Sequence, residues 1–250
     1  MVELDGLADT IVLRPAARRT VRCAGLEGPE NLAWRALDAL ERLVGRPLAL
    51  AVEIEKRIPL QAGLGGGSSD AATTLVGANR LLGLGLSIGE LERTAADVGS
   101  DVPFFIRGGA QWAEGRGEAL SPAAAPPFAV AVAVPRIGLS TAAVYAAFDR
   151  LPPPPPDDGR PCPTRADDLG GWARNDLWPA ALALQPRLGA AARGLVAAGA
   201  DAALLCGSGA AVAGLFPTAP EPEAPAEGAL APLHLLRWAP DSPSGPVVSG

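Results

Sequence analysis

The residues whose types and spacing could do chemistry gather in one stretch, residues 58–70, which reads IPLQAGLGGGSSD. Glycines let a backbone turn sharply and approach a ligand closely. The serines that follow them open a helical pattern, and the start of a helix offers unpaired N–H groups and a partial positive charge. A glycine loop that enters a helix in this way predicts a cradle for phosphate groups.

The serine pair leaves several roles open: Ser68 or Ser69 could cap the helix, contact a phosphate or ligate Mg²⁺. The loop is not a Walker A loop, because no Lys and Ser/Thr follow its last glycine directly. It is not a dinucleotide fingerprint either, because Ser68 stands where the third glycine belongs. The alternative is a glycine-rich connection that binds nothing. Four glycines and a serine pair between a strand pattern and a helix pattern count against that alternative.

Two further short motifs offer partners for a phosphate site. Residues 99–105 read GSDVPFF, and Asp101 is a candidate carboxylate for receiving the proton of an alcohol during phosphoryl transfer. The alternative is a turn aspartate bonded to its own backbone. Residues 207–209 read GSG, which alone is typical of an ordinary turn.

The elements that must position these motifs follow from hydrophobic periodicity. Helices are expected over residues 31–44, 71–82, 88–98 (with Ser87 as N-cap) and 140–148, and strands over 48–54 and 128–134. Residues 101–106 and 110–113 predict a strand pair joined by a Gly-Gly turn. A Pro/Ala link at 123–127 is the candidate domain boundary, so the pattern predicts an α+β protein with two lobes.

Composition narrows the class of protein. The chain has 250 residues, of which 48% are hydrophobic and 19% charged, which fits one large or two small folded domains. A net charge of −6 argues against nucleic acid or an anionic membrane as a main partner, but leaves room for an anionic small molecule. The three cysteines are far apart and no leader or membrane-length apolar run is evident, so we expect reduced thiols and a cytoplasmic protein.

Taken together, the motifs resemble a known family. The pattern P-x-x-A-G-L-G-G-G-S-S-D-A-A resembles the second signature of the GHMP kinases, and its triple glycine with SSD is similar to the diphosphocytidyl-methylerythritol kinases. GSDVPFF and CGSGAAVAGLF, at residues 206–216, resemble the signatures that follow. The resemblance implies that the ATP phosphates are held by Pro59, Leu60, Gln61, Ala62, Gly63, Leu64, Gly65, Gly66, Gly67, Ser68 and Ser69.

The resemblance also implies roles elsewhere in the chain. It places Asn31 and Lys56 near the adenine side and makes Asp101 the catalytic base. It makes Gly207, Ser208 and Gly209 a second tight loop facing the phosphate site. Tyr145 falls where the family sets an aromatic ring against the cytosine of the substrate, although a packed core tyrosine is an alternative. Residues 175–177, Asn-Asp-Leu, match the family pattern as well, without an assigned role.

The fold implied by the resemblance has an ATP-binding lobe like ribosomal protein S5 domain 2, over residues 1–125, and a ferredoxin-like lobe over residues 126–250. The implied reaction transfers the γ-phosphoryl group of ATP, with Mg²⁺, to the 2-hydroxyl of 4-diphosphocytidyl-2-C-methyl-D-erythritol. Another GHMP small-molecule kinase stays open as an alternative. So does an ATP-binding relative with weak catalysis. The metal ligands and the oligomeric state are left unassigned.

The resemblance fails at the start of the chain. Family members open with a strand that carries P-A-K-[IL]-N-L and then D-G-Y-H, whereas this chain opens with MVELDGLADTIVL, which looks like the segment after those motifs. We therefore expect an upstream segment with a lysine that stabilises the transferring phosphoryl group. Without that segment, the N-terminal sheet is expected to have an unpaired edge.

Overall fold

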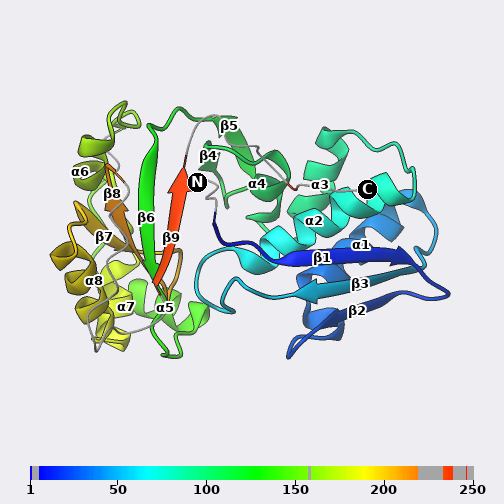
Figure 1. The fold of residues 1–250 in the computed structure, drawn as a ribbon, viewed down its shortest axis with the longest axis horizontal. Helices are drawn as coiled ribbons and strands as arrows, with labels where there is room; N and C mark the ends of the chain where they lie inside the picture. Colours follow the sequence, from blue (N-terminus) through cyan, green and yellow to red (C-terminus); the bar gives the residue numbers. More distant parts are fainter. Residues whose placement is uncertain (2–5, 157–158, 219–232, 239–245, 247–250) are drawn as a thin grey trace.

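The computed structural model describes residues 1, 6–156, 159–218, 233–238 and 246. Two groups of elements lie side by side, each built on its own sheet, with the N-terminal half on the right in Figure 1. A small hairpin and a short helix lie between them at the top of that view. The predicted α+β organisation is confirmed.

The N-terminal half is a three-stranded sheet covered by helices on one face. The strands run in the order β1-β3-β2, with β1 antiparallel and β2 parallel to β3. Among the described residues, β1 and β2 are therefore the edges of this sheet. The elements are β1 (Thr10–Pro15), β2 (Thr20–Cys23), η1 (Gly28–Glu30), α1 (Leu32–Val44), β3 (Leu50–Glu55), α2 (Gly66–Leu81) and α3 (Ile88–Val98).

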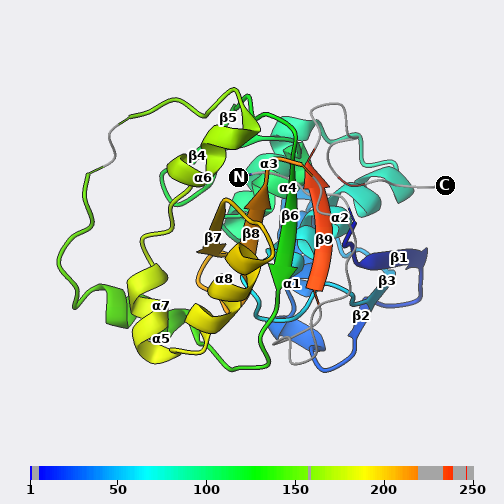
Figure 2. The ribbon, with the colours of Figure 1, turned by 60° about the vertical axis from the view of Figure 1, so that its left-hand side comes forward.

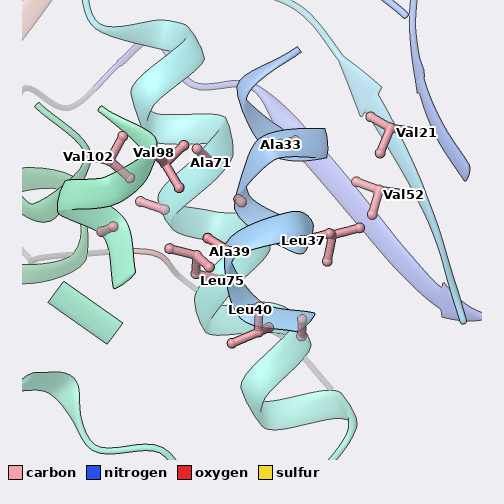
Figure 3. Close-up of a cluster of buried hydrophobic side chains, with 14 of the residues drawn as sticks. Val21, Ala33, Leu37, Ala39, Leu40, Val52, Ala71, Leu75, Val98 and Val102 are labelled. Atoms are coloured by element: carbon pink, nitrogen blue, oxygen red, sulfur yellow. The ribbon is translucent and has the colours of Figure 1, made fainter. Parts of the chain in front are cut away.

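The core of this half lies between the sheet and helices α1 and α2 (Figure 3). Leu37 and Leu40 are fully buried on α1 because residues three or four apart share one face of a helix. They pack with Val52 of β3 and Leu75 of α2. The predicted helix at 31–44 is confirmed, and the Asn31 side chain accepts a hydrogen bond at its N-cap.

The predicted strand pair at residues 101–106 and 110–113 is wrong. The first segment is a helix, α4 (Val102–Arg107), with a proline in its first turn, where the missing N–H costs nothing. A short continuous apolar run does not distinguish strand from helix by periodicity, which explains the error. The second segment belongs to β4 (Gln111–Glu114), which pairs with β5 (Ala119–Pro122) instead.

The C-terminal half is a four-stranded antiparallel sheet in the order β7-β8-β6-β9, with helices packed on one side (Figure 2). The expected strand at 128–134 and helix at 140–148 are confirmed within a residue at each end. The elements are β6 (Phe128–Ala133), α5 (Thr141–Phe148), η2 (Ala166–Asp168), α6 (Leu169–Trp172), α7 (Trp178–Leu184), α8 (Leu188–Ala197), β7 (Ala202–Leu205), β8 (Val212–Phe216) and β9 (Leu233–Trp238).

Strand β6 is buried on both faces. Ala129 and Ala131 face the cluster that includes the buried residues of α7 and α8. Val130 and Val132 face a smaller cluster that includes Ala62, from the glycine loop of the other half. The sheet therefore lies between its own helices and the N-terminal half, as Figure 1 shows.

The division at residues 125 and 126 stays a prediction. It is supported by two large apolar clusters, one drawn from residues 11–106 and one from residues 129–216. Among the described residues, no helix combines the length and the apolar character needed to cross a membrane.

The start of α3 supplies a test of the fold outside the glycine loops. The Ser87 hydroxyl accepts from the Glu90 amide at 3.4 Å, and the Glu90 carboxylate accepts from the Ser87 amide at 2.9 Å, which is a reciprocal capping box. We expect Ser87→Ala to lower the free energy of unfolding by about 1 kcal/mol in urea denaturation. Glu90→Gln, which retains an acceptor for the Ser87 amide, should change it less. Equal losses in both variants would contradict this role for the cap.

Candidate active site

Helix α2 begins inside the glycine run, five residues earlier than predicted from the sequence. Gly65 holds the N-cap position in the left-handed region, at φ 71°, and no side chain caps the helix. Ser68 and Ser69 lie in the first turn, so the alternative that either one caps the helix is wrong. The N–H groups of this turn are left without a side-chain acceptor at the cap, which suits an anionic ligand.

The two glycine loops touch each other. The Ala211 amide donates to the Ala62 carbonyl at 3.0 Å. A Cβ atom built on Gly63 would lie 1.9 Å from the Cys206 carbonyl oxygen, so only a glycine fits there. One built on Gly207 would lie 3.2 Å from the Gly63 carbonyl oxygen. The structure therefore brings the 207–209 loop against the loop that enters α2.

Asp101 reaches the same region through helix α4. It precedes the helix at its N-cap, and its carboxylate accepts a hydrogen bond from the Ser100 hydroxyl at 3.3 Å. Four residues later, on the same side of the helix, the Phe105 ring would lie 2.6 Å from a Cβ atom on Gly65. Asp101 is exposed, and its Oδ1 atom would lie 3.4 Å from a Cβ atom built on Gly117, in the turn between β4 and β5.

Lys56 does not point freely at a ligand. Its ammonium donates to Asp9 at 2.5 Å and to Asp70 at 2.8 Å, and both carboxylate side chains are almost fully buried. The second oxygen of Asp9 accepts from the backbone amides of Arg57 and Ile58. This charge cluster, Asp9–Lys56–Asp70, ties together the segment before β1, the segment after β3 and the first turns of α2.

Burial dominates the electrostatics of the cluster. It raises the pKa of Asp70 from 3.8 to about 7, although the hydrogen bond and charge of Lys56 act in the opposite direction. One oxygen of Asp70 is buried without a partner among the described residues. For Lys56, burial lowers the pKa, but the hydrogen bonds to Asp70 and Asp9 outweigh it and the pKa is raised. The lysine is therefore held as a cation.

Asn31 uses its side chain within the protein. The residue is 2% exposed, its amide nitrogen donates to the Leu26 carbonyl, and its oxygen accepts from the Ala33 amide. Burial raises the pKa of the nearby Cys23 thiol, although the charge of Lys56 and the Asn31 side chain act in the opposite direction. Cys23 also lines a cavity of about 450 Å³ on the β1-β3-β2 sheet.

Tyr145 lies on α5 and is 52% exposed, so the alternative of a packed core tyrosine is wrong. At the first residue of the same helix, the hydroxyls of Thr141 and Ser208 are 2.8 Å apart. The second glycine loop thus contacts α5 as well as the first glycine loop.

Sequence reasoning gave no role to Asp9 and Asp70. Asp9 is separated from Lys56 by 47 residues, so no local pattern signals their contact. A usable signal did exist in composition, because Lys56 is the single lysine of the chain. A lone lysine beside a glycine loop invites a search for buried carboxylates.

Comparisons with known proteins place these features in a family. Residues 31–109 match the model of the GHMP kinases N terminal domain. A 4-diphosphocytidyl-2-C-methyl-D-erythritol kinase of Geobacter metallireducens is 44% identical over 199 residues, which are 76% of this chain and 68% of that protein. One of Anaeromyxobacter dehalogenans (strain 2CP-C) is 43% identical over 233 residues, 87% of this chain and 72% of that protein.

The chain belongs to the 4-diphosphocytidyl-2-C-methyl-D-erythritol kinase family of GHMP kinases. A crystal structure of 4-(cytidine 5'-diphospho)-2C-methyl-D-erythritol kinase matches with a TM-score of 0.71 and 33% identity, covering 92% of this chain and 86% of that one. The structure of a homoserine kinase from Cytophaga hutchinsonii matches with a TM-score of 0.66 and 17% identity, covering 86% of this chain and 78% of that one. At that identity the match shows a shared fold only. The two-lobed GHMP kinase fold expected from the sequence is confirmed.

The contact between the loops predicts a severe effect of one methyl group. In Gly63→Ala the new Cβ must displace the Cys206 backbone, so we expect loss of ATP binding by at least tenfold and a lower free energy of unfolding. Gly83→Ala is the matched control, because Gly83 also has a positive φ but its Cβ would meet nothing within 4 Å. Isothermal titration with ATP and urea denaturation measure both effects. Equal behaviour of the two variants would rule out the loop contact as the cause.

The charge cluster predicts a pH dependence of stability. Between the usual value of 3.8 and about 7, the folded protein keeps a proton on Asp70 that the unfolded chain releases. The free energy of unfolding therefore falls as pH rises through this window. Above about pH 7, the ionisation of Asp70 causes no further fall. Asp70→Asn should flatten the fall measured by urea denaturation from pH 5 to pH 8.

Asp97→Asn makes the same charge change at an exposed position and serves as the control for that measurement. It should leave the pH dependence as in the parent protein. If the free energy of unfolding of Asp70→Asn varies with pH in the same way as that of the parent protein, the pKa of Asp70 is not raised.

Proposed function

We propose that this chain is a small-molecule kinase that transfers the γ-phosphoryl group of ATP to the 2-hydroxyl of 4-diphosphocytidyl-2-C-methyl-D-erythritol. The identity of 43–44% to relatives named as that kinase supports the substrate. The observation that carries the chemistry is the contact of Phe105 with Gly65. It sets the Asp101 carboxylate and the uncapped start of α2 on one assembly.

In this proposal the ATP phosphates lie along residues 59–69. The backbone N–H groups at the start of α2 donate to the phosphate oxygens, and the helix dipole favours their negative charge. Lys56 supports this loop indirectly. Its hydrogen bonds to Asp70 and Asp9 hold the start of α2 next to the segments that flank β1 and β3. The adenine lies on the side of Asn31 and Lys56, as the resemblance to the GHMP kinases implies.

Mg²⁺ fits this site as a companion of the nucleotide. Among the described residues, no group of three or more His, Cys, Asp or Glu side chains could hold a metal by itself. Kinase sites hold Mg²⁺ with one or two protein oxygens, phosphate oxygens and water, so the hydroxyls of Ser68 and Ser69 are sufficient candidates. When bound, the ion neutralises the charge that develops on the phosphates.

Asp101 acts on the acceptor. Phosphoryl transfer depends mainly on positioning and on charge stabilisation, with one group to orient the attacking hydroxyl. The exposed carboxylate of Asp101 accepts a hydrogen bond from the substrate 2-hydroxyl and receives its proton as the bond to phosphorus forms. The Ser100 hydroxyl already donates a hydrogen bond to this carboxylate.

The cytidine end of the substrate lies toward α5. The exposed ring of Tyr145 offers a face on which a pyrimidine can stack. The second glycine loop, Gly207–Ser208–Gly209, lies between this ring's helix and the first loop and contacts the part of the substrate near the reacting hydroxyl. The partner in this proposal is a small molecule. We place the reaction in the cytoplasm, which agrees with the free cysteines at positions 23, 162 and 206.

The test is ATP-dependent phosphorylation of 4-diphosphocytidyl-2-C-methyl-D-erythritol, followed by ³¹P NMR, with homoserine and mevalonate as alternative acceptors. The chain is assayed beside a form extended upstream in frame. Turnover of the diphosphocytidyl substrate by either form supports the proposal. ATP binding by both forms without turnover of any acceptor would favour an ATP-binding protein, and preference for another alcohol would favour a different GHMP kinase.

Asp101→Asn tests the proposed base. The amide keeps the shape but cannot take the proton, so we expect kcat to fall roughly 100-fold or more while KM for ATP changes little. Kinetics are measured on the form that turns over, and Asp97→Asn, an exposed aspartate on α3, is the charge-matched control. An unchanged kcat in Asp101→Asn would exclude this carboxylate from the chemistry.

A further inference from the structure

Asn175 lies in the link between α6 and α7, in the one motif to which sequence reasoning gave no role. Its side-chain nitrogen donates to the carbonyls of Leu205 and Gly207, both at 2.8 Å. Its side-chain oxygen accepts from the Leu177 amide at 2.9 Å. One amide group thus joins the entry of α7 to the second glycine loop, across about 30 residues of chain.

The two carbonyls lie where the second glycine loop leaves strand β7. Leu205 is the last residue of β7, and Gly207 begins the loop. The Gly207 position faces Gly63 of the first loop, and Ser208 meets Thr141 of α5. A shift of this loop therefore moves contacts to the phosphate side and to the acceptor side together.

We propose that Asn175 is a positioning residue, which holds the second glycine loop in the place where ATP and the acceptor alcohol are brought into line. It does so through the two hydrogen bonds that its side-chain nitrogen donates to these carbonyls. The kinetic part of this inference rests on the proposed kinase function. The loop-holding part does not.

The Asn175 side chain donates through its nitrogen and accepts through its oxygen, and one substitution removes the first interaction while it keeps the second. Asn175→Asp keeps an oxygen for the Leu177 amide, so the start of α7 retains its partner. The same change sets a carboxylate oxygen against the carbonyls of Leu205 and Gly207, where the donors were. Repulsion replaces two hydrogen bonds, and the loop should move away.

The experiment measures loop position and kinetics on the same variants. Amide hydrogen exchange of the peptide that spans residues 206–211 should be at least tenfold faster in Asn175→Asp. The value of kcat should fall at least tenfold through misalignment, and KM for ATP should rise with it, because the second glycine loop contacts the first at Gly63. Lowering the pH should restore part of kcat, relative to the parent profile, because the protonated carboxyl can donate once.

Asn79→Asp is the matched control. Asn79 holds a turn by the same chemistry, donating to the Leu86 carbonyl and accepting from the Leu86 amide, both at 3.0 Å. That turn joins α2 to α3, far along the chain from the second glycine loop. This variant should lose stability without a change in kcat. If Asn175→Asp does not fold, Asn175→Ser keeps an acceptor for Leu177 and removes the reach of the donors, with the same expected direction.

The outcomes separate the inference from the proposed function. Faster exchange at residues 206–211 supports the loop-holding role even if the acceptor alcohol is a different one. Unchanged exchange in a folded Asn175 variant overturns the inference. So does a kcat loss in Asn175→Asp no larger than that in Asn79→Asp, because that is the result of a merely structural asparagine.

Discussion

The structure depends on a close approach of two backbones, one from each half of the chain. The first glycine loop meets the second at Gly63, where the Cys206 carbonyl occupies the space that any side chain would need. The hydrogen bond from Ala211 to Ala62 fixes the same approach. Glycine is required there for lack of room as well as for its positive φ. This contact joins the glycine loops of the two halves of the chain.

A second constraint is electrostatic. Lys56 carries its charge in a mostly buried position, where an isolated cation would be costly, and two carboxylates offset that cost. Burial raises the pKa of Asp70, while Asp9 is anchored by two backbone amides. The cluster therefore fixes the geometry at the start of α2 by linking three segments. The charged groups of the cluster are paired within the protein, with one another and with backbone amides.

The sequence was informative where the signal is local. The amphipathic spacing of residues 31–44 and the Ser87 cap predicted two helices that the structure has. The glycine run located the loop, although α2 begins at Gly66 because glycines in a first turn carry no apolar pattern. The same weakness led to the wrong prediction of a strand at residues 101–106, where a proline and an unbroken apolar run are compatible with either element.

The contacts that complete the site are long-range, and no periodicity encodes them. Asp9 meets Lys56 from 47 residues away, and Asn175 meets Gly207 from 32 residues away. In sequence both residues look like ordinary loop polar residues. The packing of α4, the helix that follows Asp101, against the glycine loop also depends on a tertiary contact, between Phe105 and Gly65. Resemblance to a family nominated Asp101, but only the fold gives the physical reason for its place.

Strand β6 limits how the molecule can move. Its alternate residues are buried against helices on one side and against the glycine loop on the other. A hinge that swung the two halves apart would bring Val130 and Val132 into water and break the bond between Ala211 and Ala62. Substrate entry by wide domain opening is therefore disfavoured.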